Sequence, residues 1–192
     1  MTTIGILIFP QVEELDFIGP FEVLNYVNKV RPNSTKVLLV AKTLEPITAF
    51  NGLKIIPDIT IEECPVLDII IAPGGKGRMV AMKDALIQKF IFKQAKTATY
   101  ITSVCTGAFL LAEAGLLRGK KATTYHTAFD ELKAYGIDVV SSKVVKDGNL
   151  ITAGGVSSGI ELGFYLLKEL FGSKISQEVA DKIEYNIDVD TL

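Results

Sequence analysis

The chain has 192 residues with one His, and its 20 Lys and Arg against 22 Asp and Glu give a net charge of −2. This balance provides no strong field to attract phosphates or anionic lipids, so we expect neither nucleic acid nor a membrane as a partner. With 48% hydrophobic and 22% charged residues, the chain can bury a large core as a single domain over residues 1–192. Disordered and fibrous classes are excluded.

The two cysteines, Cys64 and Cys105, do not make the disulfide framework on which small secreted domains depend. The first residues show no positive leader or cleavage site, and no apolar run reaches about 18 residues, so we expect neither export nor a membrane span. We therefore expect a cytoplasmic protein. Two Cys and one His are too few ligands for a zinc site, so we expect no metal.

The first part of the chain alternates between strand-like and helix-like patterns. An apolar run at residues 4–9 predicts a buried strand. Apolar residues at helical spacing then predict a helix over 19–27, with Pro20 in its first turn. A second strand is predicted at 36–41, and Asn51-Gly52 between two apolar runs favours a small antiparallel hairpin.

A buried strand predicted at residues 68–72 leads directly into Pro73-Gly74-Gly75, which suggests a functional loop. Beyond it the same patterns predict helices at 84–95, 106–114, 129–135 and 157–171, strands at 99–103 and 122–125, a hairpin around Asp147-Gly148, and a terminal helix with a loose tail over 174–192. This alternation predicts an α/β fold with a mostly parallel central sheet and helices on both faces. In such folds the site lies at the carboxyl ends of the strands.

Cys105 lies where a predicted strand ends and a helix begins, with the small residues Ser103 and Gly107 two positions to either side. This pattern is typical of a nucleophile elbow, a strained turn that presents a reactive side chain. The following helix should lower the pKa of the thiol and favour thiolate. The alternative is a small buried hydrophobe, which is how we interpret Cys64, since no helix begins after it.

Gly74 and Gly75 are candidates for a backbone site that binds negative charge. Adjacent glycines can turn N–H groups inward, and the amides of Gly75 and Thr106 would together form an oxyanion hole. The alternative is an ordinary turn between a strand and a helix.

Asp16 lies between Leu15 and Phe17 in the expected loop after the first strand, so its side chain should point inward. Burial beside a thiol should raise the pKa of this carboxyl, and the protonated acid could donate a hydrogen bond to the Cys105 sulfur. The alternative is that Asp16 caps the helix that begins near Gly19.

Three stretches, residues 15–20, 68–75 and 103–124, resemble the ThiJ/PfpI superfamily, and the resemblance covers about residues 3–171. It implies a flavodoxin-like three-layer sandwich, also described as class I glutamine amidotransferase-like. It further implies a homodimer formed partly near the active site, Cys105 as nucleophile, Asp16 as its acidic partner and a role for Thr106.

The protease-like members carry His directly after the nucleophilic Cys, whereas this chain has Thr106 there, which argues against a peptidase. His126, the only histidine, follows the predicted strand at 122–125. It either lines the substrate cleft or lies at the surface or in a dimer contact.

Within the superfamily the chain is most similar to the isonitrile hydratase branch. This implies an enzyme without metal or cofactor that adds water to a small isonitrile to give an N-substituted formamide. The alternatives are amidase or protease-related chemistry, glyoxalase or deglycase chemistry, and a redox-sensing or ligand-binding module like those fused to transcriptional regulators. Nothing after Phe171 is long or basic enough for a helix-turn-helix, which counts against a regulator.

Overall fold

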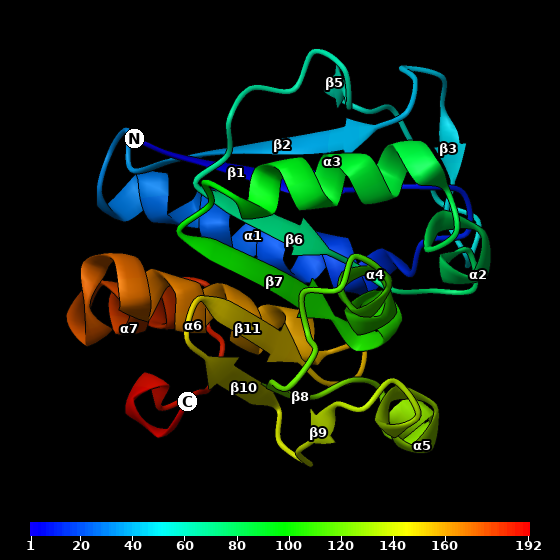
Figure 1. Ribbon diagram of the computed structural model, residues 1–192. Coiled ribbons are helices and arrows are strands. Elements are labelled where there is room, and N and C mark those ends of the chain that lie inside the picture. The colour runs from blue at the N-terminus through cyan, green and yellow to red at the C-terminus, as the bar shows by residue number, and fades with distance from the viewer.

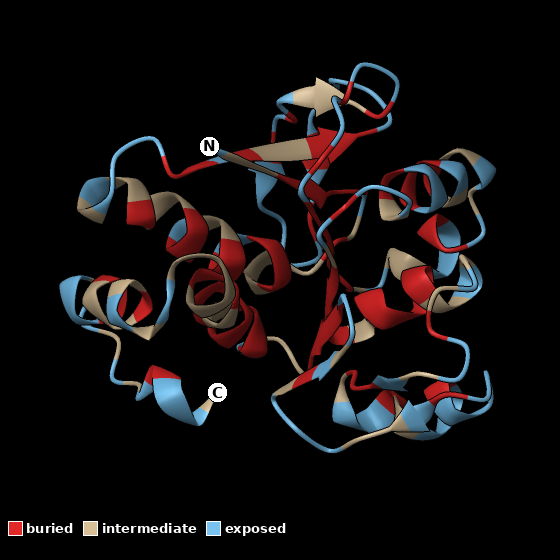
Figure 2. Ribbon diagram, turned by 60° about the vertical axis from the view of Figure 1, so that its left-hand side comes forward, coloured by how far each residue is buried: buried red, intermediate tan, exposed pale blue.

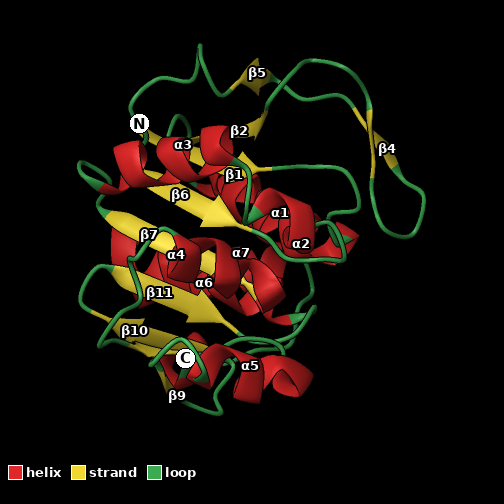
Figure 3. Cartoon of the chain, turned by 45° about the vertical axis from the view of Figure 1, so that its right-hand side comes forward, coloured by secondary structure: helices red, strands yellow, loops and turns green.

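A seven-stranded sheet forms the centre of the structure, a computed structural model that describes residues 1–192 (Figure 1). In sheet order the strands are β10 (Val144–Asp147), β11 (Leu150–Ala153), β7 (Tyr100–Val104), β6 (Ile69–Ala72), β1 (Thr2–Leu7), β2 (Thr35–Ala41) and β5 (Ile59–Thr60). All neighbours pair in parallel except β10, which is antiparallel to β11. The parallel strands therefore direct their carboxyl ends to one edge (Figure 3).

Helices cover both faces of this sheet (Figures 1 and 2). One face carries α1 (Glu14–Val30), α6 (Ser158–Phe171) and α7 (Ser173–Lys182), and the other carries α2 (Arg78–Ala81), α3 (Ala85–Ala95) and α4 (Ala108–Glu113). A short helix, α5 (Phe129–Lys133), lies beyond the β10 side of the sheet. The predicted α/β sandwich is confirmed. None of the helices has both the length and the apolar character needed to cross a membrane.

The central strands are buried on both faces, which explains their uninterrupted apolar sequences. All four residues of β6 and of β11 are buried. Buried side chains form one contiguous core of 51 residues, seen as red along the sheet and the inner sides of the helices in Figure 2.

The first helix begins at Glu14, earlier than predicted, and Pro20 lies inside it rather than in its first turn. Proline lacks the N–H that would donate to the carbonyl of Asp16, so this carbonyl loses its helical partner. Gly159 of α6 packs against this point, where a Cβ would lie 3.0 Å from Pro20 Cδ and 3.1 Å from Leu15 O. Asp16 is therefore in the first turn of α1 and not in the preceding loop.

Both predicted hairpins are present. Strands β3 (Ile47–Thr48) and β4 (Lys54–Ile55) pair around Asn51-Gly52, and β10 pairs with β11 just after Asp147. The strand predicted at 122–125 is shorter: β8 (Lys121–Ala122) pairs with β9 (Asp138–Val139) in a separate small sheet. Beyond Ala122 the Thr123 N–H donates to the side chain of Thr152, at 2.8 Å from its Oγ1, and not to a backbone carbonyl of a neighbouring strand.

The C-terminal tail is held in place, and the prediction of a loose tail is wrong. A single turn of 3₁₀ helix, η3 (Val189–Thr191), follows α7, and Val189 is buried. Lys168 Nζ donates to the carbonyls of Val189 at 3.0 Å and Leu192 at 3.3 Å. These contacts had no sequence signal, since they join α6 to the chain end.

Candidate active site

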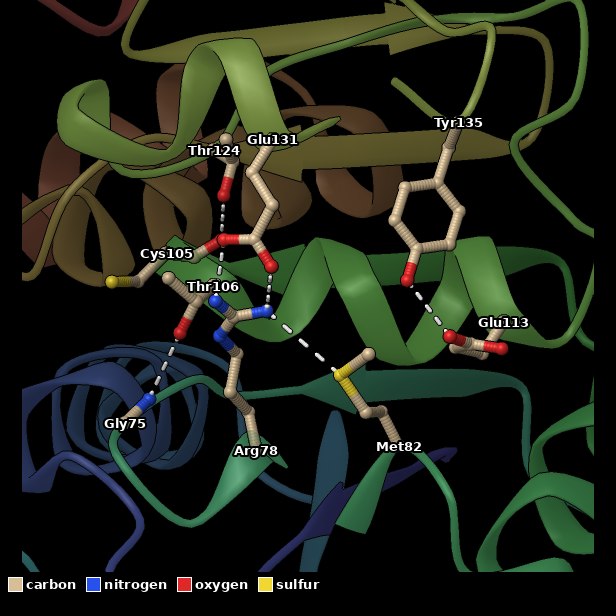
Figure 4. Close-up of polar contacts among 9 residues, drawn as sticks. All are labelled: Gly75, Arg78, Met82, Cys105, Thr106, Glu113, Thr124, Glu131 and Tyr135. Atoms are coloured by element: carbon tan, nitrogen blue, oxygen red, sulfur yellow. Dashed lines mark hydrogen bonds and ion pairs between the residues drawn. The ribbon is translucent and has the colours of Figure 1, made fainter. Parts of the chain in front are cut away.

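Cys105 occupies a strained turn at the end of β7. Its φ of 55° lies in the left-handed region, which a residue with a side chain rarely adopts. The turn is held at both backbone groups, because Cys105 N donates to Gly154 O at 2.7 Å and Thr124 Oγ1 donates to Cys105 O at 2.8 Å (Figure 4). A turn of 3₁₀ helix, η1 (Cys105–Gly107), then leads into α4. The predicted nucleophile elbow is confirmed.

The glycine after the elbow is required by close packing. A Cβ at Gly107 would overlap Ala72 O and lie 2.8 Å from the carbonyl carbon of Pro73. The end of β6 therefore passes directly against the nucleophile turn, and any larger residue at Gly107 would force them apart.

Asp16 points into the protein beside the thiol, as predicted. Its side chain is completely buried, and Oδ2 accepts a hydrogen bond from Gly74 N at 2.9 Å. The other oxygen, Oδ1, has no hydrogen-bond partner of regular geometry, and the Cys105 thiol lies close enough for each group to affect the ionisation of the other. Burial raises the pKa of Asp16 to about 7, and the Gly74 amide opposes this only in part. No side chain caps the start of α1, so the capping alternative is wrong.

The thiol behaves differently from the prediction. The pKa of Cys105 is raised to about 12, first by burial and then by the neighbouring Asp16 carboxylate. The Thr106 N–H and hydroxyl act in the opposite direction but do not compensate, because η1 is a single turn and the thiol is almost fully buried. Burial also raises the pKa of Cys64, to about 11.

Asp16 and Cys105 therefore titrate as a pair. The first proton leaves near pH 7 and the second only near pH 12, because two negative charges cannot be accommodated side by side in the core. Between these two steps the pair holds a single proton.

The glycine loop and Thr106 form the second side of the site. Gly75, with φ of 109°, donates its N–H to Thr106 Oγ1 at 3.1 Å. A Cβ at Gly74 would lie only 2.6 Å from Thr106 N. The Gly75 amide, which was expected to face a developing negative charge, thus already donates to the Thr106 hydroxyl. The Gly74 amide likewise already donates to the Asp16 carboxylate.

His126 lies at the surface of the protein. It is exposed at the start of a 3₁₀ turn, η2 (His126–Ala128), with its ring 4.5 Å from that of Tyr125. It lines a small cavity of about 310 Å³ together with Thr124 and Gly154, the two residues that bond to the Cys105 backbone. No hydrogen bond joins His126 to Cys105 or Asp16. Of the two interpretations left open, the structure shows a surface histidine at the rim of this cavity.

Two further features of the site edge carried no sequence signal. Arg78 and Glu131 form a two-pronged ion pair, with N–O distances of 2.9 and 2.6 Å (Figure 4). A cavity of about 690 Å³ lies at the carboxyl ends of β1 and β2, and neither Cys105 nor Asp16 lines it. No cluster of three or more His, Cys, Asp or Glu side chains is placed to hold a metal ion.

Comparison with known proteins places this fold in a family. Isonitrile hydratase from Pseudomonas putida is 46% identical over 182 residues, which are 95% of this chain and 78% of the relative. A THiJ/PfpI family protein from Pseudomonas syringae superposes with a TM-score of 0.90 at 34% identity, covering 97% of this chain and 76% of that one. Drosophila melanogaster DJ-1beta superposes with a TM-score of 0.85 at 25% identity, covering 97% and 99%. Residues 2–169 match the DJ-1/PfpI family model, so the predicted resemblance is confirmed and the chain belongs to the DJ-1/PfpI family.

Proposed function

We propose that this protein is a cysteine-dependent hydratase that adds water to a small isonitrile and releases an N-substituted formamide. The observation that carries the proposal is the buried Asp16–Cys105 pair, in a chain 46% identical to an isonitrile hydratase. The pair supplies a nucleophile and a proton donor in direct contact, and this reaction needs no further acid or base.

The first step joins the sulfur to the substrate. Transfer of the shared proton from thiol to carboxyl leaves a Cys105 thiolate beside a protonated Asp16. The thiolate attacks the terminal isonitrile carbon and forms a C–S bond, and the Asp16 proton goes to the same carbon. The product is a thioimidate, R–N=CH–S–Cys105, with Asp16 now ionised.

The second step consumes water. The Asp16 carboxylate removes a proton from a water molecule as its oxygen adds to the thioimidate carbon, and this proton passes to the nitrogen. A proton from the new hydroxyl returns to the pair as the C–S bond breaks, so R–NH–CHO leaves and the pair again holds one proton. We propose that the Thr106 N–H and hydroxyl stabilise the departing thiolate, and that Gly74 and Gly75 orient Asp16 and Thr106 through their amides.

The same geometry argues against peptide hydrolysis. A peptidase must protonate an amine leaving group, which usually requires a positioned histidine. His126 is exposed and bonded to neither member of the pair, and Thr106 follows the nucleophile. We therefore place His126 at the cleft edge, where it could contact substrate without transferring protons.

The proposed reaction is tested with purified protein and a panel of alkyl isonitriles, simple amides and methylglyoxal, with products identified by NMR. We expect formamides from the isonitriles, loss of turnover in the Cys105→Ser variant, and normal turnover in the matched Cys64→Ser variant. Consumption of methylglyoxal or an amide without any turnover of isonitriles would refute the proposed reaction.

We also infer a homodimer that is formed near the site. Glu14 Oε1 accepts from Asn51 N at 2.7 Å and thereby holds the tip of the β3–β4 hairpin against the start of α1. Three apolar side chains near this contact are 37–46% exposed: Ile18, one turn after Glu14 in α1, and Phe50 and Leu53 at the hairpin tip. Such exposed apolar side chains are typical of subunit contacts.

Because both cysteines are free, we infer a reducing compartment, the cytoplasm.

A further inference from the structure

Arg78 joins three separate elements around the nucleophile turn. Its guanidinium lies 4.0 Å from the centre of the Phe109 ring in α4, and it forms the two-pronged ion pair with Glu131 in α5 (Figure 4). Its side chain is only 12% exposed, whereas the Glu131 side chain is 45% exposed. A planar fork bound to a carboxylate and stacked on a ring holds both partners in defined orientations.

Each of the joined elements continues into a segment that contacts Cys105 or its neighbour. Arg78 N donates to Gly75 O at 3.2 Å, so the side chain begins one turn after the Gly75–Thr106 hydrogen bond. Glu131 follows closely after Thr124, whose hydroxyl holds the Cys105 carbonyl. Phe109 lies in the first turn of α4, directly after η1.

The ion pair therefore spans the elbow from one side to the other. It links the glycine loop directly to α5, which follows the Thr124 segment, in addition to the turn that both segments support. A left-handed cysteine is strained and persists only where its surroundings hold it.

We propose that Arg78 is a positioning residue, which, through Glu131 and Phe109, holds the glycine loop and the Thr124 segment against the elbow and so keeps Thr106 in place next to Cys105. The effect of Arg78 on turnover rests on the proposed hydratase function. The effect of Arg78 on structure, a fixed Gly75–Thr106 hydrogen bond, is independent of that function.

The test compares Arg78→Met, Arg78→Lys and Glu131→Gln with a matched control, Asp130→Asn. Asp130 lies on the same helix beside Glu131 but pairs only with Lys133, and its side chain is 95% exposed. Methionine retains an apolar chain without the fork, and lysine retains the charge without the planar geometry. Glutamine retains the shape of Glu131 and removes its charge.

Two measurements report the positioning directly. In ¹⁵N-labelled protein, the Gly75 amide should exchange at least about tenfold faster in Arg78→Met and Glu131→Gln than in wild type. The midpoint of the pH profile for iodoacetamide alkylation of Cys105 should move upward by about half a unit, because a loosened Thr106 no longer favours the thiolate. Arg78→Lys should give intermediate values, and Asp130→Asn should match wild type.

With an alkyl isonitrile as substrate, we expect kcat to fall by about tenfold to a hundredfold and KM to change by less than about threefold. The double variant of Arg78→Met with Glu131→Gln should lose no more than Arg78→Met alone, since Arg78→Met already removes the contact with Glu131. A lower Tm with unchanged Gly75 exchange and unchanged alkylation would overturn the proposal.

If Arg78→Met fails to fold, Glu131→Gln, at the more exposed end of the ion pair, decides the question by the same measurements. A wild-type protein inactive on isonitriles would refute the hydratase proposal while exchange and alkylation still tested Arg78.

Discussion

Replacement of Asp16 by asparagine removes an ionisable group from the core and should change how stability depends on pH. The pKa of this carboxyl is 3.8 in an exposed chain and about 7 in the fold, mainly because burial disfavours the charged form. Between these values the folded protein binds more protons than the unfolded chain, so the free energy of unfolding falls as pH rises through this window. Below both values the carboxyl is protonated in both states and has no effect.

The size of the effect follows from the difference between the two pKa values. A difference of about three corresponds to about 4 kcal/mol, at about 1.4 kcal/mol for each unit. In the Asp16→Asn variant the amide oxygen can still accept from the Gly74 N–H, and no charge is forced into the core. Relative to wild type, the variant should therefore gain about 4 kcal/mol between pH 4 and pH 8, as an upper value.

Urea unfolding of both proteins at intervals across this pH range measures the difference between their free energies of unfolding. The contributions of all other carboxyls cancel in this difference, because both proteins contain them. The Asp130→Asn variant serves as the control, since that carboxyl is exposed. A difference between Asp16→Asn and wild type that stays constant with pH would show that the fold does not raise the pKa of Asp16, and the shared-proton mechanism would lose its basis.

Three further outcomes are expected. Iodoacetamide should label Cys105 before Cys64 near pH 8, because only Cys105 can pass its proton to a carboxylate; mass spectrometry that finds Cys64 labelled first would contradict this. Asp16→Asn should lower the pKa of the Cys105 thiol below about 12, abolish the ionisation of the Asp16–Cys105 pair near pH 7 and reduce turnover by about a hundredfold or more; survival of both the step near pH 7 and the turnover would make Asp16 a bystander. His126→Asn should retain isonitrile turnover within about tenfold, whereas casein proteolysis that is lost in this variant would indicate a peptidase.

The parts of the fold that follow local rules could be predicted from the sequence. Strands covered on both faces have continuous apolar sequences, and the elbow is contained within five consecutive residues, 103–107. The start of α1 was missed because Pro20 is typical of a first helical turn, and only the packing of Gly159 shows why it is accommodated deeper in the helix.

The chemistry of the site was less predictable than its residues. Asp16 and Cys105 could each be identified from neighbouring residues, yet the direction of the thiol pKa depends on burial and on their contact, which join distant parts of the chain. The same holds for the pair of Arg78 and Glu131, 53 positions apart. Sequence patterns report which face of an element is buried, but not which polar groups meet there.

The two edges of the central sheet restrict how copies of this protein can associate. At one edge β5 has only two residues, and at the other β10 has four, so neither offers a long template for a strand from another chain. Lys146 on β10 is also held by Glu169 of α6 at 2.6 Å, which keeps a charge beside that edge. Growth of the sheet from molecule to molecule is therefore disfavoured, and the homodimer proposed above would join its two copies through side chains on helices and loops, leaving the sheet of each copy complete in itself.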